Sequence, residues 1–270
     1  MASRGALTLH ESTRKDLPSS PDDPQYAPWV DCAVSAALRL VGSLSSSPDA
    51  AADSARVWTK GKLHNGAQTY STRSVHSPPP GSGDTEGFKW HARKSIHDAT
   101  IDRVSYEHFE RGLLRDHSVN ESKYIESCTE AKQIDVVKAG ELEVWQTLYH
   151  LAFPASDRDF AFAILTVPVP PPPPSPALGP GSGSRRRAFV VISIPYAHPT
   201  APGYTRGKYV SVEHVAERSD GKVEWTMAVS SDPGGLVPKF VSEMSMPSKV
   251  SEDVPSFVKW ARSEYGESLA

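Results

Sequence analysis

Three polar residues that alternate along one segment, Arg93, Ser95 and His97, are the first candidates for chemistry in this sequence. Side chains two positions apart on a strand share a face, so these three would project together. A guanidinium and an imidazole on one face can bind the carboxylate, phenol or other headgroup of a ligand, or move a proton. The alternative is a solvated outer face, because Ala92 and Ile96 make the opposite face apolar.

Two further groups of charged residues have a functional and a structural interpretation. His117 and Glu121 stand four residues apart and would meet on a helix surface. The pair could do acid-base work, but no third ligand with metal spacing stands nearby, so an ordinary helix interaction is favoured and no metal site is predicted. Arg158 stands between Asp157 and Asp159 and could hold an acidic ligand group, although an ion pair that pins the local turn explains it better.

Several strand-like segments carry aromatic residues that share a face. They could line a cavity for a hydrophobic ligand, and the candidates are Trp145, Tyr149, Tyr209, Glu213, Trp225 and Met227. Each of them taken singly is explained better by core packing. Glu213 differs, because a carboxylate on an inward face is costly without a partner and could act as a base if its pKa rises.

The segments that must position these residues follow a clear order. A helix is expected over 28–44, and three strands follow over 56–63, 69–75 and 88–97. A helical segment in one or two pieces is expected over 106–125. Period-two patterns and hairpin turns then predict six strands, over 132–138, 141–152, 158–167, 188–197, 208–218 and 222–231. Short hairpin links imply an antiparallel sheet.

The segment from Asp232 to Tyr265 predicts a long helix that packs against this sheet. An apolar stripe at helical spacing runs along it, and Phe240 and Met244 belong to its first half. We expect both side chains to line a cavity as well as the core. Pro247 and Pro255 each remove an intrahelical hydrogen bond, so the helix should be bent or divided.

Together these elements predict an α+β helix-grip fold. A curved antiparallel sheet of about nine strands would wrap around the C-terminal helix, and an internal cavity would remain if the sheet does not close tightly. Residues 28–270 would form a single domain after a disordered, polar tail over 1–27. A proline- and glycine-rich loop insertion is expected over 168–187.

Two segments resemble the START-like, or helix-grip (SRPBCC), superfamily, which includes the lipid-transfer START domains and the birch-pollen-allergen type. Residues 236–260 are similar to the START C-terminal helix, and residues 153–165 to the turn that introduces an aromatic strand. A fungal START-like family of unknown function is the closer resemblance, carried by Trp90, Arg93, Ser95, His97, Phe109, His117, Glu121, Tyr124, Arg158 and Phe160. The resemblance implies a cavity for a hydrophobic ligand and names no ligand.

Composition narrows the classes of function. A net charge of −3 with dispersed Lys and Arg gives no nucleic-acid footprint. Two cysteines make no disulfide framework, and no leader or spanning segment is recognised, so a cytoplasmic protein is expected. The motifs of nucleophilic hydrolases and nucleotide-binding enzymes are missing, and no cofactor is predicted.

The proline-rich loop has two interpretations as well. Pro170–Pro176 could offer a polyproline surface to an SH3 or WW domain, and Arg185–Arg187 could make a transient contact with a membrane surface. A tolerated hairpin insertion is favoured over either role.

The sequence thus leaves two hypotheses of different class. The first is a protein that binds a hydrophobic small molecule or lipid and could also transfer it. The second is a cavity enzyme of secondary metabolism, a cyclase, isomerase or dehydratase, that uses Arg93, His97 or Glu213 as acid or base. Both need these residues to face the interior.

Overall fold

The computed structural model describes residues 7–45, 58–72, 89–151, 156–170, 186–237 and 239–267. Its helices are η1 (Arg14–Asp16), α1 (Tyr26–Gly42), η2 (Ser43–Ser45), α2 (Ala99–Asp102), α3 (Tyr106–Phe109), the π-helical turn η4 (Glu110–Leu114), α4 (His117–Tyr124) and α5 (Lys239–Tyr265). Its strands are β1 (Trp58–His64), β2 (Ala67–Thr72), β3 (His91–His97), β4 (Cys128–Lys138), β5 (Leu142–Tyr149), β6 (Arg158–Val169), β7 (Ala188–Pro195), β8 (Thr205–Arg206), β9 (Lys208–Glu217) and β10 (Val223–Asp232).

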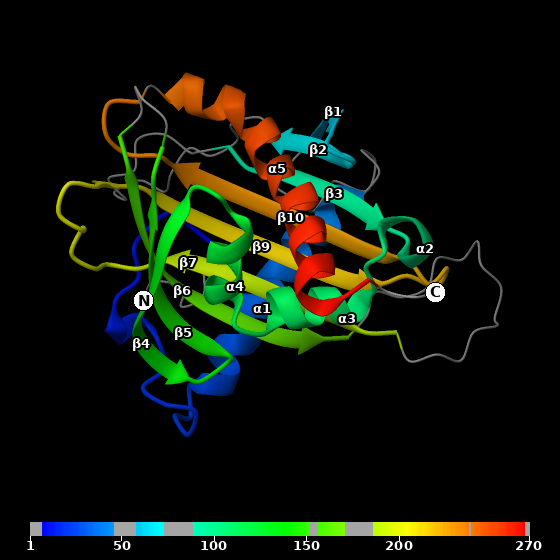
Figure 1. Cartoon of the computed structure of the whole chain (residues 1–270). Coiled ribbons are helices and arrows are strands. Elements are labelled where there is room, and N and C mark those ends of the chain that lie inside the picture. The colour runs from blue at the N-terminus through cyan, green and yellow to red at the C-terminus, as the bar shows by residue number, and fades with distance from the viewer. Residues whose placement is uncertain are drawn as a thin grey trace.

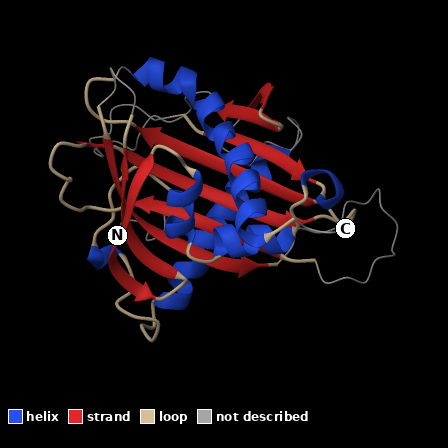
Figure 2. Cartoon of the chain, viewed as in Figure 1, coloured by secondary structure: helices blue, strands red, loops and turns tan. Residues whose placement is uncertain are grey.

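The strands form a single curved sheet in the order β1-β2-β3-β10-β9-β7-β6-β5-β4 (Figure 2). Neighbours along this order are antiparallel, and the two-residue strand β8 pairs with β6 in parallel. The predicted α+β helix-grip fold is confirmed. The short β8 escaped prediction because two residues carry no periodicity.

Helices cover both faces of the sheet (Figure 1). We call the face covered by α3, α4 and α5 the inner face; α1 packs on the opposite, outer face. The strand β7 shows the consequence, because all of its residues are buried. A strand covered on both sides cannot alternate apolar and polar residues as a half-exposed one does.

The inner face is packed solidly at the end where α5 finishes. The rings of Phe109, Trp225 and Phe257 meet there, with centroids 4.9 to 5.5 Å apart. Gly112 permits this approach, because a Cβ on it would lie 2.6 Å from the ring of Phe257. This aromatic core anchors the second half of α5 to the sheet.

The prediction of a disordered tail over 1–27 is wrong for residues 7–25. Ser12 pairs with Tyr196 beside β7, and Leu17 is buried with only 6% of its surface exposed. The indole Nε1 of Trp29 in α1 donates a hydrogen bond to the carbonyl oxygen of Asp16 (3.1 Å). The pairing with Tyr196, the hydrogen bond from Trp29 and the burial of Leu17 thus hold a segment whose polar composition indicated disorder. Residues 1–6 lie outside the described part of the chain.

The loop insertion begins later than predicted, because β6 continues to Val169. Pro168 pairs with Phe189 of β7, and β5 has already ended at this level, since its last partner in β6 is Leu165. A proline is tolerated there because only one neighbouring strand needs hydrogen bonds. Arg187 is held by Glu217 (2.7 Å) and Glu107 (2.6 Å). Residues 171–185, which include most of the expected polyproline segment, are outside the described ranges.

The helix α5 is continuous through both of its prolines and changes direction along its length (Figure 1). The prediction that Met244 lines a cavity is wrong, because 80% of its surface is exposed. Ten residues at about 100° each place Met244 about 80° away from Val254, which faces the sheet. The side chain of Phe240 is outside the described part, so its predicted role stays a prediction.

Candidate functional site

Arg93 is the centre of a polar site on the inner face, and none of its surface is exposed. Ser95 and His97 are buried as well, which rules out the solvated outer face. The Nε of Arg93 donates to the carbonyl oxygen of Val250 in α5, and its guanidinium lies 3.8 Å from the ring centroid of Trp225. Its Nη1 and Nη2 have no hydrogen-bond partner among the described residues. A buried guanidinium therefore retains donors that nothing in this part of the chain satisfies.

Glu213 on β9 faces Arg93 on β3 across β10, the single strand that lies between them in the sheet. Met227 of β10 pairs with Arg93 on one side and with Glu213 on the other. Glu213 Oε2 lies 3.9 Å from Arg93 Nη2 and accepts a hydrogen bond from Trp225 Nε1 (2.8 Å). The inward carboxylate thus has the partners that its burial requires.

The helix α4 adds a histidine and a second carboxylate. His117 Nδ1 lies 2.8 Å from the carbonyl oxygen of Leu113, and because a carbonyl only accepts, Nδ1 carries a proton. His117 Nε2 lies 3.8 Å from Glu213 Oε1 and 3.9 Å from Glu121 Oε2. The His117–Glu121 pair is therefore part of the buried site, and the favoured interpretation as an ordinary helix interaction misses its second carboxylate.

The helix α5 contributes a third carboxylate, Asp253, which sequence reasoning did not identify. Burial raises the pKa of Asp253 to about 7, Arg93 opposes this rise, and the neighbouring Glu121 and Glu213 add to it. Burial likewise raises the pKa of Glu121, with Glu213 contributing in the same direction. We call Glu121, Glu213 and Asp253 the carboxylate cluster. Asp253 is therefore partly protonated at neutral pH, and the pKa of Glu121 is shifted in the same direction.

Tyrosine and phenylalanine rings continue from the polar site across β5, β6 and β9. Phe160 meets Tyr149 and Tyr209 edge to face, with centroids 5.5 and 5.4 Å apart. Burial raises the pKa of Tyr149, Tyr209 and Tyr124 well above the ordinary value, so their hydroxyls remain protonated donors. Yet each of these rings is only half-buried, in contrast to the solid core around Phe109.

His97 is separated from this site by the aromatic core. Its Nε2 hydrogen-bonds Ser95 Oγ (2.8 Å), and its ring packs against Phe109 and Trp225. Burial lowers the pKa of His97 to about 4, so it is neutral at physiological pH. The structure therefore brings together Arg93 and Glu213 and leaves His97 in a packed, aromatic environment.

The remaining candidates divide between the inner face and a local turn. Trp145 and Trp225 belong to the inner core, and Met227 is half-buried between the two strands of the polar site. Arg158 donates to the carbonyl and hydroxyl oxygens of Ser156, so it contacts the local turn by hydrogen bonds, and the expected ion pair is not formed among the described residues. Its neighbour Asp159 pairs instead with Arg206 (3.1 Å).

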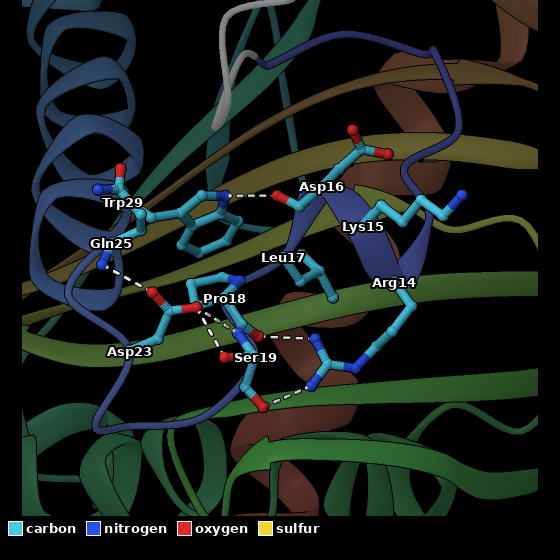
Figure 3. A pocket seen from close by; sticks show the side chains of 9 residues that line it. All are labelled: Arg14, Lys15, Asp16, Leu17, Pro18, Ser19, Asp23, Gln25 and Trp29. Atoms are coloured by element: carbon cyan, nitrogen blue, oxygen red, sulfur yellow. Dashed lines mark hydrogen bonds between the residues drawn. The ribbon is translucent and has the colours of Figure 1, made fainter.

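A hollow of about 420 Å³ lies on the other side of the molecule, between residues 14–19 and the start of α1 (Figure 3). Its polar groups satisfy one another: Arg14 donates to the carbonyl oxygens of Pro18 and Ser19, and Asp23 accepts from Ser19 and Gln25. These contacts hold the N-terminal segment on the sheet and do not converge on a ligand position.

Among the described residues, no group of His, Cys, Asp and Glu side chains has the arrangement of a metal site. No helix in the described ranges is long and apolar enough to cross a membrane.

Comparison with known families places the chain. Residues 90–261, well over half of the sequence, match a family described as proteins of unknown function (DUF3074). The chain belongs to this family. The match spans β3, α4, β9 and α5, and so contains every residue of the polar site. None of the curated proteins matches the chain at a significant level.

Solved structures agree with the fold. Human StAR-related lipid transfer protein 5 is 15% identical, with a TM-score of 0.61, over 88% of this chain and 98% of the other. Human STARD10 is 13% identical with a TM-score of 0.54 over 77% and 74%, and a lipid transfer protein from Xanthomonas axonopodis is 13% identical with 0.52 over 76% and 98%. The resemblance to the START-like helix-grip fold is confirmed, and at such identities it shows the fold alone.

Proposed function

We propose that the protein binds a hydrophobic small molecule or lipid between the inner face of the sheet and helices α4 and α5. One observation carries the proposal. The rings of Tyr149, Phe160 and Tyr209 on the inner face are only half-buried, so the described residues leave aromatic surface uncovered there. The proposed ligand would cover this surface, and its polar end would lie toward the buried, unsatisfied guanidinium of Arg93. An apolar volume with a few convergent polar groups is typical of small-molecule sites.

The fold supports the same proposal by analogy, because solved relatives are described as lipid transfer proteins. Transfer of the ligand between membranes would need α5 to move. The first half of α5 is the part able to do so, since the aromatic core anchors the second half.

The experiment is native mass spectrometry of the purified protein, followed by extraction of the bound molecule and a vesicle-to-vesicle transfer assay. The variant Ala131→Trp fills the space from β4, where Ala131 packs beside the inner core. The matched control is Lys132→Trp, one residue along and exposed. We expect a bound apolar molecule in the wild type and the control, and its loss in Ala131→Trp. An empty wild-type protein with no transfer activity contradicts the proposal.

A second function, a cavity enzyme that transfers protons, is favoured by one observation. The pKa of Asp253 rises to about 7, which suits a group that both accepts and donates protons near neutral pH. Arg93 would hold a carbonyl oxygen while Asp253 moves a proton, and Glu213 is held in place by Trp225. His97, one of the predicted acid-base candidates, packs against Phe109 and Trp225 and hydrogen-bonds Ser95, so we do not assign it this role.

Extraction distinguishes the enzyme from the binding protein. If the protein is an enzyme, the molecule extracted from Asp253→Asn is an unconverted precursor with a composition or isomeric form different from that in the wild type. Identical molecules in both proteins contradict the enzyme hypothesis and leave binding as the function.

A further inference from the structure

The charges around Arg93 limit what kind of polar end a ligand can bring to the site. The guanidinium of Arg93 faces Glu213 on β9 and Asp253 on α5, and Glu121 on α4 lies beside both of these carboxylates. Asp253 precedes the buried Val254 and lies three residues after Val250, whose carbonyl oxygen accepts a hydrogen bond from Arg93. His117 stands between two of them, with Nε2 within 4 Å of both. The described part of the site therefore contains more potential negative charge than positive charge.

The hydrogen-bonding groups point the same way. Arg93 Nη1 and Nη2 are fully buried donors without acceptors, so a ligand atom that meets them must accept. The carboxylate cluster offers acceptors, so the same ligand group gains from donating to it. A hydroxyl does both, and a carbonyl accepts from Arg93 without adding charge. An anion satisfies Arg93 but brings a further negative charge beside three carboxylates in an enclosed site.

We propose that the site selects hydrophobic ligands whose polar end is an uncharged hydroxyl or carbonyl over ligands that end in an anion, and that Asp253 sets this selectivity. The proposal rests on the proposed binding function and names its ligand class. Of the ligand groups that the sequence led us to expect at Arg93, a headgroup, carboxylate or phenol, it disfavours the carboxylate.

Asp253 is the discriminating residue because the other two carboxylates are already engaged. Glu213 accepts from Trp225 and faces Arg93, and Glu121 faces His117. The described residues give the side chain of Asp253 no hydrogen bond or ion pair within 4 Å, and it is half-buried. Its negative charge is therefore the one that an incoming anion meets with least compensation.

The selectivity should depend on pH through Asp253. The charged and titratable groups that face Asp253 are Arg93 on β3, Glu213 on β9, Glu121 and Tyr124 on α4, and Glu252 on α5 itself. Because Asp253 is charged above about pH 7 and protonated below it, repulsion of an anion grows as pH rises. The discrimination should be strong at pH 8 and weak at pH 6.

The experiment measures dissociation constants of matched probe pairs for the full chain by intrinsic tryptophan fluorescence. The pairs are cholesterol with cholesterol sulfate, whose anion does not titrate in this range, and hexadecanol with hexadecanoate. In the wild type at pH 8 we expect the anionic probe of a pair to bind about tenfold or more weakly than the neutral one. In Asp253→Asn the ratio of the two constants should fall about tenfold and lose its dependence on pH.

The matched control is Glu264→Gln, which removes an exposed carboxylate from the same helix that is not among the groups facing Asp253, and it should keep the wild-type ratio. Glu121→Gln is the second variant and should lower the ratio in the same direction. A wild-type protein that binds both probes of a pair equally, or a ratio that Asp253→Asn and Glu264→Gln change alike, overturns the selectivity while ligand binding stands. Failure of all four probes to bind overturns the proposed function together with the selectivity.

Discussion

The buried Asp253 predicts an unusual dependence of stability on pH. Folding raises its pKa from the ordinary value of 3.8 to about 7, so the folded protein holds a proton that the unfolded chain releases. Between these two values the folded state binds more protons, and stability falls as pH rises through the window. Above pH 7 the protein retains a charged carboxylate in a site that disfavours it.

The substitution Asp253→Asn removes this penalty, because asparagine resembles the protonated acid. A shift of about three pH units corresponds to an upper limit of about 4 kcal/mol at 1.36 kcal/mol per unit. Asp253 keeps some exposed surface and interacts with Glu121, whose pKa is also raised, so we expect about half of this, ~2 kcal/mol, at pH 8.

The assay is urea denaturation of ligand-free protein between pH 4 and pH 8, followed by tryptophan fluorescence. Asp253→Asn should be more stable than the wild type at pH 8, and the difference in the free energy of unfolding should vanish as pH approaches 4. Glu264→Gln serves as control, since its carboxylate is exposed, does not face Asp253, and its removal should leave the pH profile intact. Parallel profiles for Asp253→Asn and the wild type would falsify the buried, protonated state of this residue.

Three other substitutions test the site and its supporting core by the free energy of unfolding. Arg93→Met leaves the carboxylate cluster without its cation and should cost about 3–5 kcal/mol. The control Lys94→Met changes a half-buried residue on the other face of β3 and should cost less than about 1 kcal/mol, so equal losses would contradict the central role of the guanidinium. Gly112→Ala puts a Cβ 2.6 Å from a packed aromatic ring and should cost about 1–3 kcal/mol, while Gly42→Ala, with open space around it, should be neutral or stabilising. Phe257→Ala empties the aromatic core under α5 and should cost about 3–5 kcal/mol; a loss below 1 kcal/mol would show that α5 is not anchored there.

The order of elements could be predicted from local pattern because period and turn chemistry act over a few residues. The hairpin at Asn65 and Gly66, the break before α4 and the long α5 all follow from such signals. The errors lie where local composition competes with packing. The polar segment over residues 7–25 is held by a pairing with Tyr196 beside β7, which is far away in sequence, and by a hydrogen bond from the helix α1 that follows it.

The candidate site was predicted in part. Arg93 and His97 share a face because alternate residues do so on any strand. The tertiary structure decides which face α5 covers, and it also forms the aromatic core that separates His97 from the polar site. Asp253 carried a usable signal, since it lies beside Val254 and four residues before Phe257, on the stripe that faces the sheet. A carboxylate on such a stripe indicates either a mistaken helix face or a buried partner.

The sequence by itself determined that this chain makes a curved antiparallel sheet and a long amphipathic helix, because hydrophobic periodicity and turn residues specify these elements locally. Only the tertiary structure decided which polar groups meet. Arg93, Glu121, Glu213 and Asp253 come from four elements spread over most of the chain, and their charges act on one another only after the sheet curves and both helices close on it. Burial then turns an ordinary aspartate into a group that titrates near pH 7, and no local pattern records that environment.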